Sequence, residues 1–154
     1  MMINLIIIPE SIRVSKSKVS TQVFSEIYFK IGNTFFPEEK WDDFSVIILD
    51  WWLKKACNIK SDDKSVFNFM DGPYYFEVFL INGVCNISFV NDRFDRKEVV
   101  FAAEIECIDL FGLLAKNANL LIRNLPSEAE KLQDVLELKN SLKLLQNYMK
   151  SFRK

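Results

Sequence analysis

The strongest constraint on this fold is a pair of alternating apolar runs, residues 74–81 and 84–90, joined only by Asn82-Gly83. Asn-Gly between two such runs is typical of a two-residue β-hairpin, because both residue types tolerate the positive φ angles of the tight turn. The turn signal Asp71-Gly72-Pro73 precedes the hairpin, and residues 98–107 alternate again after it. The middle of the chain is therefore predicted to be an antiparallel meander.

Further strands are expected on the N-terminal side of this meander. Residues 4–12 are rich in isoleucine as far as Pro9, residues 21–36 alternate almost cleanly, and residues 65–70 lead into the first turn. β-branched and aromatic residues with a period of two favour strands. The first two of these segments are therefore predicted to be strands.

A helix is expected after the second of these strands, over residues 37–57. Proline suits the first turn of a helix, and acidic residues follow Pro37 where the helix dipole favours them. Apolar side chains then recur at steps of three and four, which indicates a stripe that faces the core. The members of this stripe are Trp41, Phe44, Ile48 and Trp51.

Two helices are expected after the sheet. Asp109 is a candidate N-cap for a helix that ends before Pro126, and Ser127 with Glu130 matches a capping box for the last helix. That helix carries a heptad-like stripe, which Leu132, Leu136 and Leu144 widen. Packing within the chain and a coiled-coil dimer are the two interpretations of this stripe. The stripe consists of Val135, Leu138, Leu142, Leu145, Met149 and Phe152.

The expected fold is a single α+β domain over residues 1–154, in the order β-β-α-β-β-β-α-α. Residues 1–107 are predicted to form a curved antiparallel sheet of about five strands with one inserted helix. Residues 109–154 are predicted to form a pair of C-terminal helices. A length of 154 residues suits one hydrophobic core.

Several classes of chemistry are disfavoured by the composition. The chain contains no histidine, which removes the commonest general base and the commonest metal ligand. It carries no nucleophile elbow, Walker loop or dinucleotide-binding loop. Cys57, Cys85 and Cys107 form no CxxC pair for zinc. We therefore expect a protein that is not an enzyme, with no catalytic residue, no metal and no cofactor.

Charge is distributed unevenly along the chain. Residues 38–109 carry fifteen acidic and eight basic side chains, although the whole chain has a net charge of −1. An acidic block disfavours direct binding to nucleic acid and favours a basic partner. The first residues, MMINLIIIPE, have no basic group ahead of a short apolar run. We therefore expect no signal peptide, no membrane span and a cytoplasmic location.

Some carboxylates are candidates for a site. Asp42, Asp43 and Asp50 stand among three tryptophans, either as a contact patch or as acids that complement the dipole of a core helix. Glu77 is a single carboxylate in the apolar run YYFEVFL. A buried carboxylate has a raised pKa and suggests an active site, whereas a half-exposed one is an ordinary surface residue.

Glu98, Glu104 and Glu106 form a further group on the last predicted strand. The alternation places all three on one face, with Glu104 and Glu106 about 7 Å apart by strand geometry. Such a pair could hold a metal or act as acid and base. The alternative is a solvated outer face of the sheet.

The order of motifs over residues 20–107 resembles that of a known protein family. FFPEEKWDDFSVIILDWW is followed by FNFMDGPYYFEVFL, a hairpin and an acidic strand. This layout is similar to small bacterial immunity proteins of contact-dependent inhibition and polymorphic toxin systems. The resemblance implies a cytoplasmic protein that binds a cognate toxin and covers its active site. Where the toxin is a nuclease, an acidic surface suits its basic cleft.

A toxin inhibitor of this kind would be a monomer or a weak homodimer. The alternative function is a homo-oligomeric scaffold or adaptor domain that pairs through the last helix or an aromatic face of the sheet. For the inhibitor, we expect acids in loops and on exposed faces to contact the partner. These candidates are Asp42, Asp43, Asp62, Asp63, Asp92, Asp95, Glu104 and Glu106.

Overall fold

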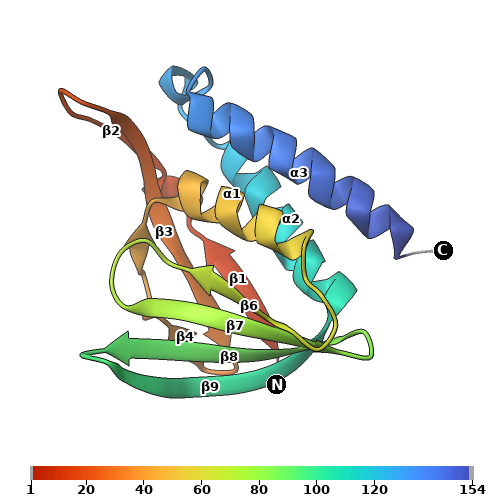
Figure 1. The fold of residues 1–154 in the computed structure, drawn as a ribbon. Coiled ribbons are helices and arrows are strands. Elements are labelled where there is room, and N and C mark those ends of the chain that lie inside the picture. Colours follow the sequence, from red (N-terminus) through yellow and green to blue (C-terminus); the bar gives the residue numbers. More distant parts are fainter. Residues whose placement is uncertain (1, 153–154) are drawn as a thin grey trace.

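The computed structural model of the protein describes residues 2–152, which fold as two antiparallel sheets and three helices (Figure 1). The first sheet has the order β1-β3-β2, and two short strands also pair with β3. Its strands are β1 (Ile3–Ile7), β2 (Arg13–Lys16), β3 (Thr21–Ile31), β4 (Thr34–Phe36) and β5 (Asp42–Asp43).

The second sheet is a meander with the order β6-β7-β8-β9. Asn82 and Gly83 both have positive φ angles, 51° and 80°, between two strands in register. The predicted Asn-Gly hairpin is therefore confirmed. The strands of this sheet are β6 (Lys64–Asn68), β7 (Tyr74–Ile81), β8 (Val84–Arg93) and β9 (Arg96–Glu106).

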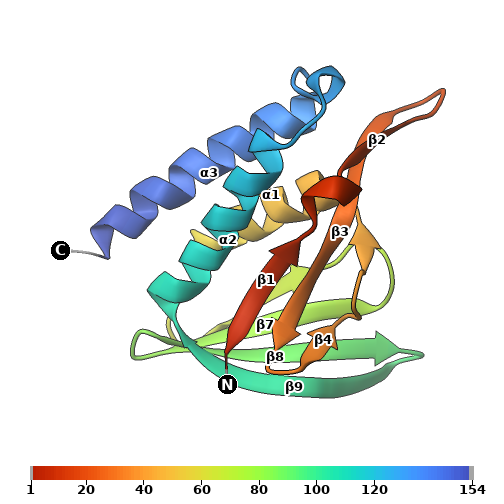
Figure 2. The same ribbon diagram turned by 180° about the vertical axis from the view of Figure 1, so that it is seen from behind.

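The helices are α1 (Ser45–Ala56), α2 (Cys107–Arg123) and α3 (Gln133–Ser151), with short 3₁₀ turns at Pro9–Ser11 and Ser127–Ala129. The three helices gather on one side of the molecule, and the strands of the two sheets cross at a steep angle (Figures 1 and 2). The α+β class, the inserted helix and the two C-terminal helices are as predicted. The strands, however, are divided between two sheets, where the sequence predicted one of about five strands.

An aromatic cluster joins the two sheets to α1. The ring of Phe29 in β3 lies 5.0 Å from that of Phe76 in β7 and 5.1 Å from that of Phe89 in β8. Trp52 of α1 lies 5.2 Å from Phe76, and all four side chains are fully buried. Large aromatic side chains contribute most of the area that such a core removes from water. The inner faces of the two sheets therefore pack against each other, with Phe29 and Phe76 at the contact.

The inserted helix begins at Ser45, not at Pro37. The chain before it is held in an extended form by β3, because Ile27 N–H donates to the carbonyl of Trp41 and Asp43 pairs with Ser25. Pairing with a distant strand therefore overrides the local preference of proline for a helix start. Trp41 and Phe44 consequently lie outside the helix.

The buried face of α1 also differs from the predicted stripe. Ile48 is fully buried as expected, but Trp51 is 43% exposed. The side chain next to it, Trp52, is fully buried. The remaining buried apolar side chains of α1 are those of Val46, Leu49, Leu53 and Ala56.

The two C-terminal helices begin at other residues than predicted. α2 begins at Cys107, so Asp109 lies within its first turn and makes no side-chain cap hydrogen bond. Ser127 opens a 3₁₀ turn, and α3 begins six residues later. The core stripe of α3 is confirmed at Val135, Leu138, Leu142 and Leu145, which are buried, but not at Phe152, which is 45% exposed.

Asp50 ties α1 to α3 and supports a prediction about stability. Its carboxylate is 6% exposed and accepts hydrogen bonds from Ser141 Oγ and, at 2.8 Å, from Lys54 Nζ. Ser141→Ala removes one donor from a buried charge, which should lower the free energy of unfolding by about 1.5–3 kcal/mol. Ser151→Ala makes the same chemical change at an exposed position of α3 and should cost less than about 0.5 kcal/mol. Equal losses of unfolding free energy for the two variants in urea denaturation would contradict this role for Asp50.

Candidate functional site

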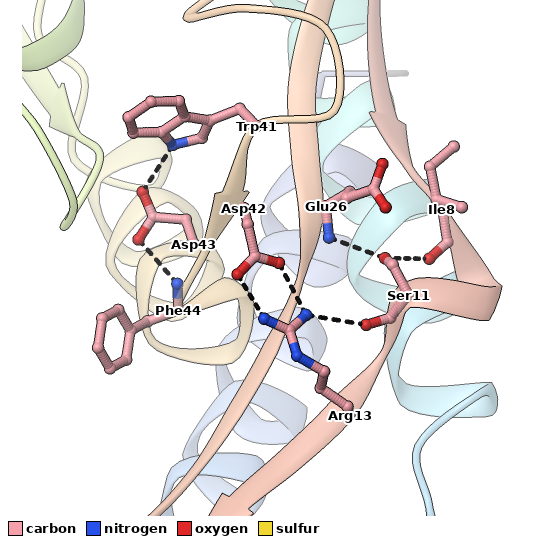
Figure 3. Close-up of polar contacts among 8 residues, drawn as sticks. All are labelled: Ile8, Ser11, Arg13, Glu26, Trp41, Asp42, Asp43 and Phe44. Carbon is pink, nitrogen blue, oxygen red and sulfur yellow. Dashed lines mark hydrogen bonds and ion pairs between the residues drawn. The ribbon is translucent and has the colours of Figure 1, made fainter.

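Asp43 is a buried structural residue (Figure 3). Its side chain is 1% exposed and accepts hydrogen bonds from Trp41 Nε1 at 3.0 Å, Phe44 N at 2.7 Å and Asp71 N at 3.2 Å. Burial raises the pKa of the carboxyl group above its usual value, although these donors oppose the shift. The expectation that Asp43 is an exposed partner contact is therefore wrong. Its carboxylate fixes the start of α1 against the turn before β7.

Asp42 is exposed, but its charge is already paired. Arg13 of β2 holds it through two hydrogen bonds, Nη1 to Oδ1 at 2.8 Å and Nη2 to Oδ2 at 2.6 Å (Figure 3). The same cation donates to the carbonyl of Ser11, whose hydroxyl donates to Ile8 O and accepts from Glu26 N. A two-point carboxylate–guanidinium contact is specific in geometry. Asp42 therefore links β5 to the bend between β1 and β2.

The remaining six candidate acids do not form one surface. Asp62 and Asp63 lie in the loop before β6, while Asp92 and Asp95 lie at the β8–β9 hairpin. Glu104 and Glu106 lie at the other end of β9. A strand rises about 3.3 Å per residue. The two hairpin acids are therefore separated from Glu104 and Glu106 by most of the length of β9. The two groups lie at opposite ends of β9.

Glu98 does not share a face with the other two glutamates of β9. The strand contains one unpaired extra residue, Val100, between residues that pair with neighbouring positions of β8. Such a β-bulge reverses the alternation of side chains on either side of it. Glu104 and Glu106 therefore face outward together, and the predicted group of three is wrong for Glu98.

Glu104 and Glu106 border a cleft of about 720 Å³, which we call the β9–α2 cleft. It lies between the start of β1, the end of β9 and the first half of α2, with Met149 of α3 on one side. Asp109 and Lys116 of α2 add further charge. The apolar part of the lining consists of Met2, Ile3, Val84, Ile105, Ile108, Leu113 and Met149.

The three carboxylates of this cleft form no ion pair within the described residues, although Lys116 lines the same cleft. Within residues 2–152, the ion pairs involve Asp42, Asp50, Glu77 and Glu128, and none involves Glu104, Glu106 or Asp109. Glu106 and Asp109 stand three positions apart, which places them near each other where the strand turns into the helix. The cleft therefore presents three carboxylates and one lysine, a net negative charge, above an apolar floor.

Gly112 leaves part of that floor open. It lies in the interior of α2, where glycine is about 0.5–1 kcal/mol less favourable than alanine. A Cβ atom placed on it would meet no heavy atom within 4 Å. Gly112 also lines a second cavity of about 540 Å³ between α2 and α3, which shares Met149 with the cleft. Gly112 thus lies between the β9–α2 cleft and this second cavity.

Sequence reasoning found only part of this cleft. The sequence indicates Glu104 and Glu106 as candidates, whereas it predicts Asp109 to be a helix cap. Lys116 and Gly112 carry no local signal, because the cleft depends on how α2 packs against β1 and β9. A helix start at Cys107 would have placed Asp109 on the cleft side of the first turn.

Glu77 is ion-paired and largely covered, on the outer face of the second sheet. Its carboxylate accepts a hydrogen bond from Lys97 Nζ at 2.7 Å, and its side chain is 13% exposed. It lies opposite Val66 and Ser88 in the neighbouring strands, on the outer face of the second sheet. The ion pair and the outward position favour the surface interpretation over a catalytic one.

Comparison with known proteins leaves the family open. The chain matches no protein-family model, no curated protein and no solved structure. Among residues 2–152, no helix has both the length and the apolar composition needed to cross a bilayer. In the same part of the chain, no three His, Cys, Asp or Glu side chains lie close enough together to hold a metal ion. The geometry of the cleft is therefore the main guide to function.

Proposed function

We propose that this protein is a non-enzymatic binding protein that holds a basic segment of a protein partner in the β9–α2 cleft. One observation carries the proposal: Glu104, Glu106 and Asp109 surround an apolar floor without an ion-pair partner of their own. A lysine or arginine side chain matches this surface, because its stem packs on apolar groups while its head meets carboxylates.

The partner that we propose is a bacterial toxin, which this protein neutralises in the cytoplasm by covering the toxin's active site. The resemblance of residues 20–107 to immunity proteins supports this assignment. Toxins that cut nucleic acid carry basic clefts, and an acidic surface speeds association with them. The acidic balance of residues 38–109 is consistent with such a partner.

Charge reversal in the cleft tests the proposal. The proposal expects a toxin domain to be encoded beside this protein's own gene. That domain is the probe, co-expressed for a growth assay and purified for binding measurements. The double variant Glu104→Lys, Glu106→Lys should weaken binding by roughly tenfold or more. The loss should be larger at low than at high salt, because salt screens exposed charges.

Two matched variants separate the cleft from general effects. Glu38→Lys with Glu39→Lys makes the same charge change at exposed positions outside the cleft, and should retain most of the affinity. Gly112→Met changes no charge and fills the open floor, so it should weaken binding while the fold remains at least as stable. Equal losses of affinity in both double variants would reject the cleft as the binding site. Failure of the wild-type protein to protect growth would reject the toxin as the partner.

A homo-oligomeric scaffold is the second candidate, and exposed leucines of α3 favour it. Leu136 is 43% exposed and Leu144 is 60% exposed. Because the opposite face of α3 is part of the core, the test is a surface variant, Leu136→Lys with Leu144→Lys, and not a truncation. Light scattering should give a dimer for the wild-type chain and a monomer for the variant if α3 pairs. A monomer in both would reject the scaffold.

A further inference from the structure

Two of the three cysteines meet in the interior. The Sγ atoms of Cys85 in β8 and Cys107 at the start of α2 lie 2.8 Å apart. The side chains are 0% and 3% exposed. The two residues are separated by twenty-two positions in the sequence and belong to no short motif, so the sequence alone gives no sign of the pair.

The backbone holds the two thiols together. Cys85 lies opposite Ile105 in the β8–β9 register, two residues before Cys107. Cys107 N–H then donates to the carbonyl of Gly83 at 3.1 Å, which fixes the turn from β9 into α2 against the start of β8. The contact between the sulfur atoms is therefore set by the sheet and not by a mobile loop.

The two thiols have different environments. Cys107 is the first residue of α2, where the helix dipole and free N–H groups favour a thiolate. The hydrogen bond from Cys85 lowers the pKa of Cys107, although burial and the charge of Glu106 oppose this shift. The same contact together with burial raises the pKa of Cys85. Cys107 is thus the nucleophile of the pair, and Cys85 is the thiol that keeps its proton.

The β9–α2 cleft gives a route to this pair. Glu106 and Ile108, on either side of Cys107, both line the cleft, as does Val84 next to Cys85. A small reagent in the cleft therefore needs only a local opening of the β9–α2 turn to reach Cys107. Cys57, by contrast, lies at the end of α1, and burial raises its pKa.

We propose that Cys85 and Cys107 are a redox-active dithiol that low-molecular-weight disulfides such as oxidised glutathione convert into an intramolecular disulfide. The Cys107 thiolate attacks one sulfur of the reagent, whose S–S bond breaks, and the leaving thiolate takes up a proton. The Cys85 thiol then loses its proton and attacks Cys107 Sγ, which expels the second reagent thiol. Two protein thiols are oxidised, and one disulfide is reduced to two thiols.

The bond would join β8 covalently to α2 beneath the cleft. A cross-link between residues far apart in sequence restricts the unfolded chain, so the oxidised protein should melt at a higher temperature than the reduced one. The proposal does not depend on the identity of the partner, because the dithiol and its reaction lie entirely within this chain.

The test uses the full chain in buffers with increasing ratios of oxidised to reduced glutathione. After acid quenching, free thiols are alkylated in denaturant, and the sites are identified by intact mass and peptide mapping. The wild-type chain and Cys57→Ser should lose two hydrogens, resist alkylation at residues 85 and 107, and melt several degrees higher. Dithiothreitol should reverse all three changes.

Single variants test the order of steps. Cys85→Ser should stop at a mixed disulfide between glutathione and Cys107. Cys107→Ser should form neither a mixed disulfide nor an intramolecular disulfide at Cys85. Wild-type protein that still has both thiols free in fully oxidised glutathione would overturn the proposal. A disulfide that joins Cys57 to either residue would do the same. The wild-type and Cys57→Ser measurements decide the matter even if a serine in the interior prevents folding.

Discussion

Replacing Asp43 by alanine is expected to lower the free energy of unfolding by about 3–5 kcal/mol. The carboxylate is 1% exposed and accepts hydrogen bonds from Trp41 Nε1 and from the backbone N–H groups of Phe44 and Asp71. Alanine would leave these donors without an acceptor in a space that water fills poorly. Urea denaturation measures the loss.

Asp42→Ala is the matched control for this change. The neighbouring carboxylate is 40% exposed and pairs with an exposed arginine, and such surface ion pairs contribute at most about 1 kcal/mol. Equal losses for the two adjacent aspartates would contradict the structural role of Asp43. A larger loss for Asp42 would show that the chain before α1 is held by the Arg13 contact instead.

The variant Asp43→Asn adds a pH test. Burial raises the pKa of Asp43 above the ordinary value of 3.8 in the folded state, so the folded state binds this proton more tightly than the unfolded state does. The resulting stabilisation is fully present below pH 3.8 and is lost as the pH rises through the folded-state pKa. The stability advantage of the wild type over Asp43→Asn should therefore shrink over that interval, and a widening advantage would contradict the shift.

Local turn chemistry explains the parts of the fold that the sequence predicted. The hairpin of β7 and β8 follows from Asn82 and Gly83, whose positive φ angles are a property of the residues themselves. The start of α1 does not follow in this way. Pro37 and the acids after it favour a helix locally, but residues 41–43 pair with residues 25–27 of β3. That partner lies beyond the few neighbouring residues on which local helix propensity depends.

The cleft and the dithiol show the same limit of sequence-based prediction for functional sites. Glu104 and Glu106 could be selected because acids on one face of a strand are visible in the alternation. The bulge at Val100, which removes Glu98 from that face, has no clear local signal. Cys85 and Cys107 come together only through the β8–β9 register, so their proximity required the paired strands.

Trp52→Ala is expected to be about as destabilising as Asp43→Ala, and should lower the free energy of unfolding by roughly 3–5 kcal/mol. The indole is fully buried, and its ring lies 5.1 Å from that of Phe69 and 5.2 Å from that of Phe76. Its Nε1–H donates to the carbonyl of Asn68 at 2.8 Å. Alanine would leave a large cavity between α1 and both sheets. For a chain of this length the loss corresponds to a fall in Tm of roughly 10 °C.

Trp51→Ala, one position away, should change the free energy of unfolding by less than about 1 kcal/mol, because that indole is 43% exposed. The two variants make the same chemical change on adjacent residues, so composition, charge and chain length cancel between them. Only the rotation of the helix about its axis distinguishes them. A helix that began at Pro37 with the stripe Trp41, Phe44, Ile48 and Trp51 would give the reverse order. Thermal melts of the pair therefore decide which face of α1 the core contains.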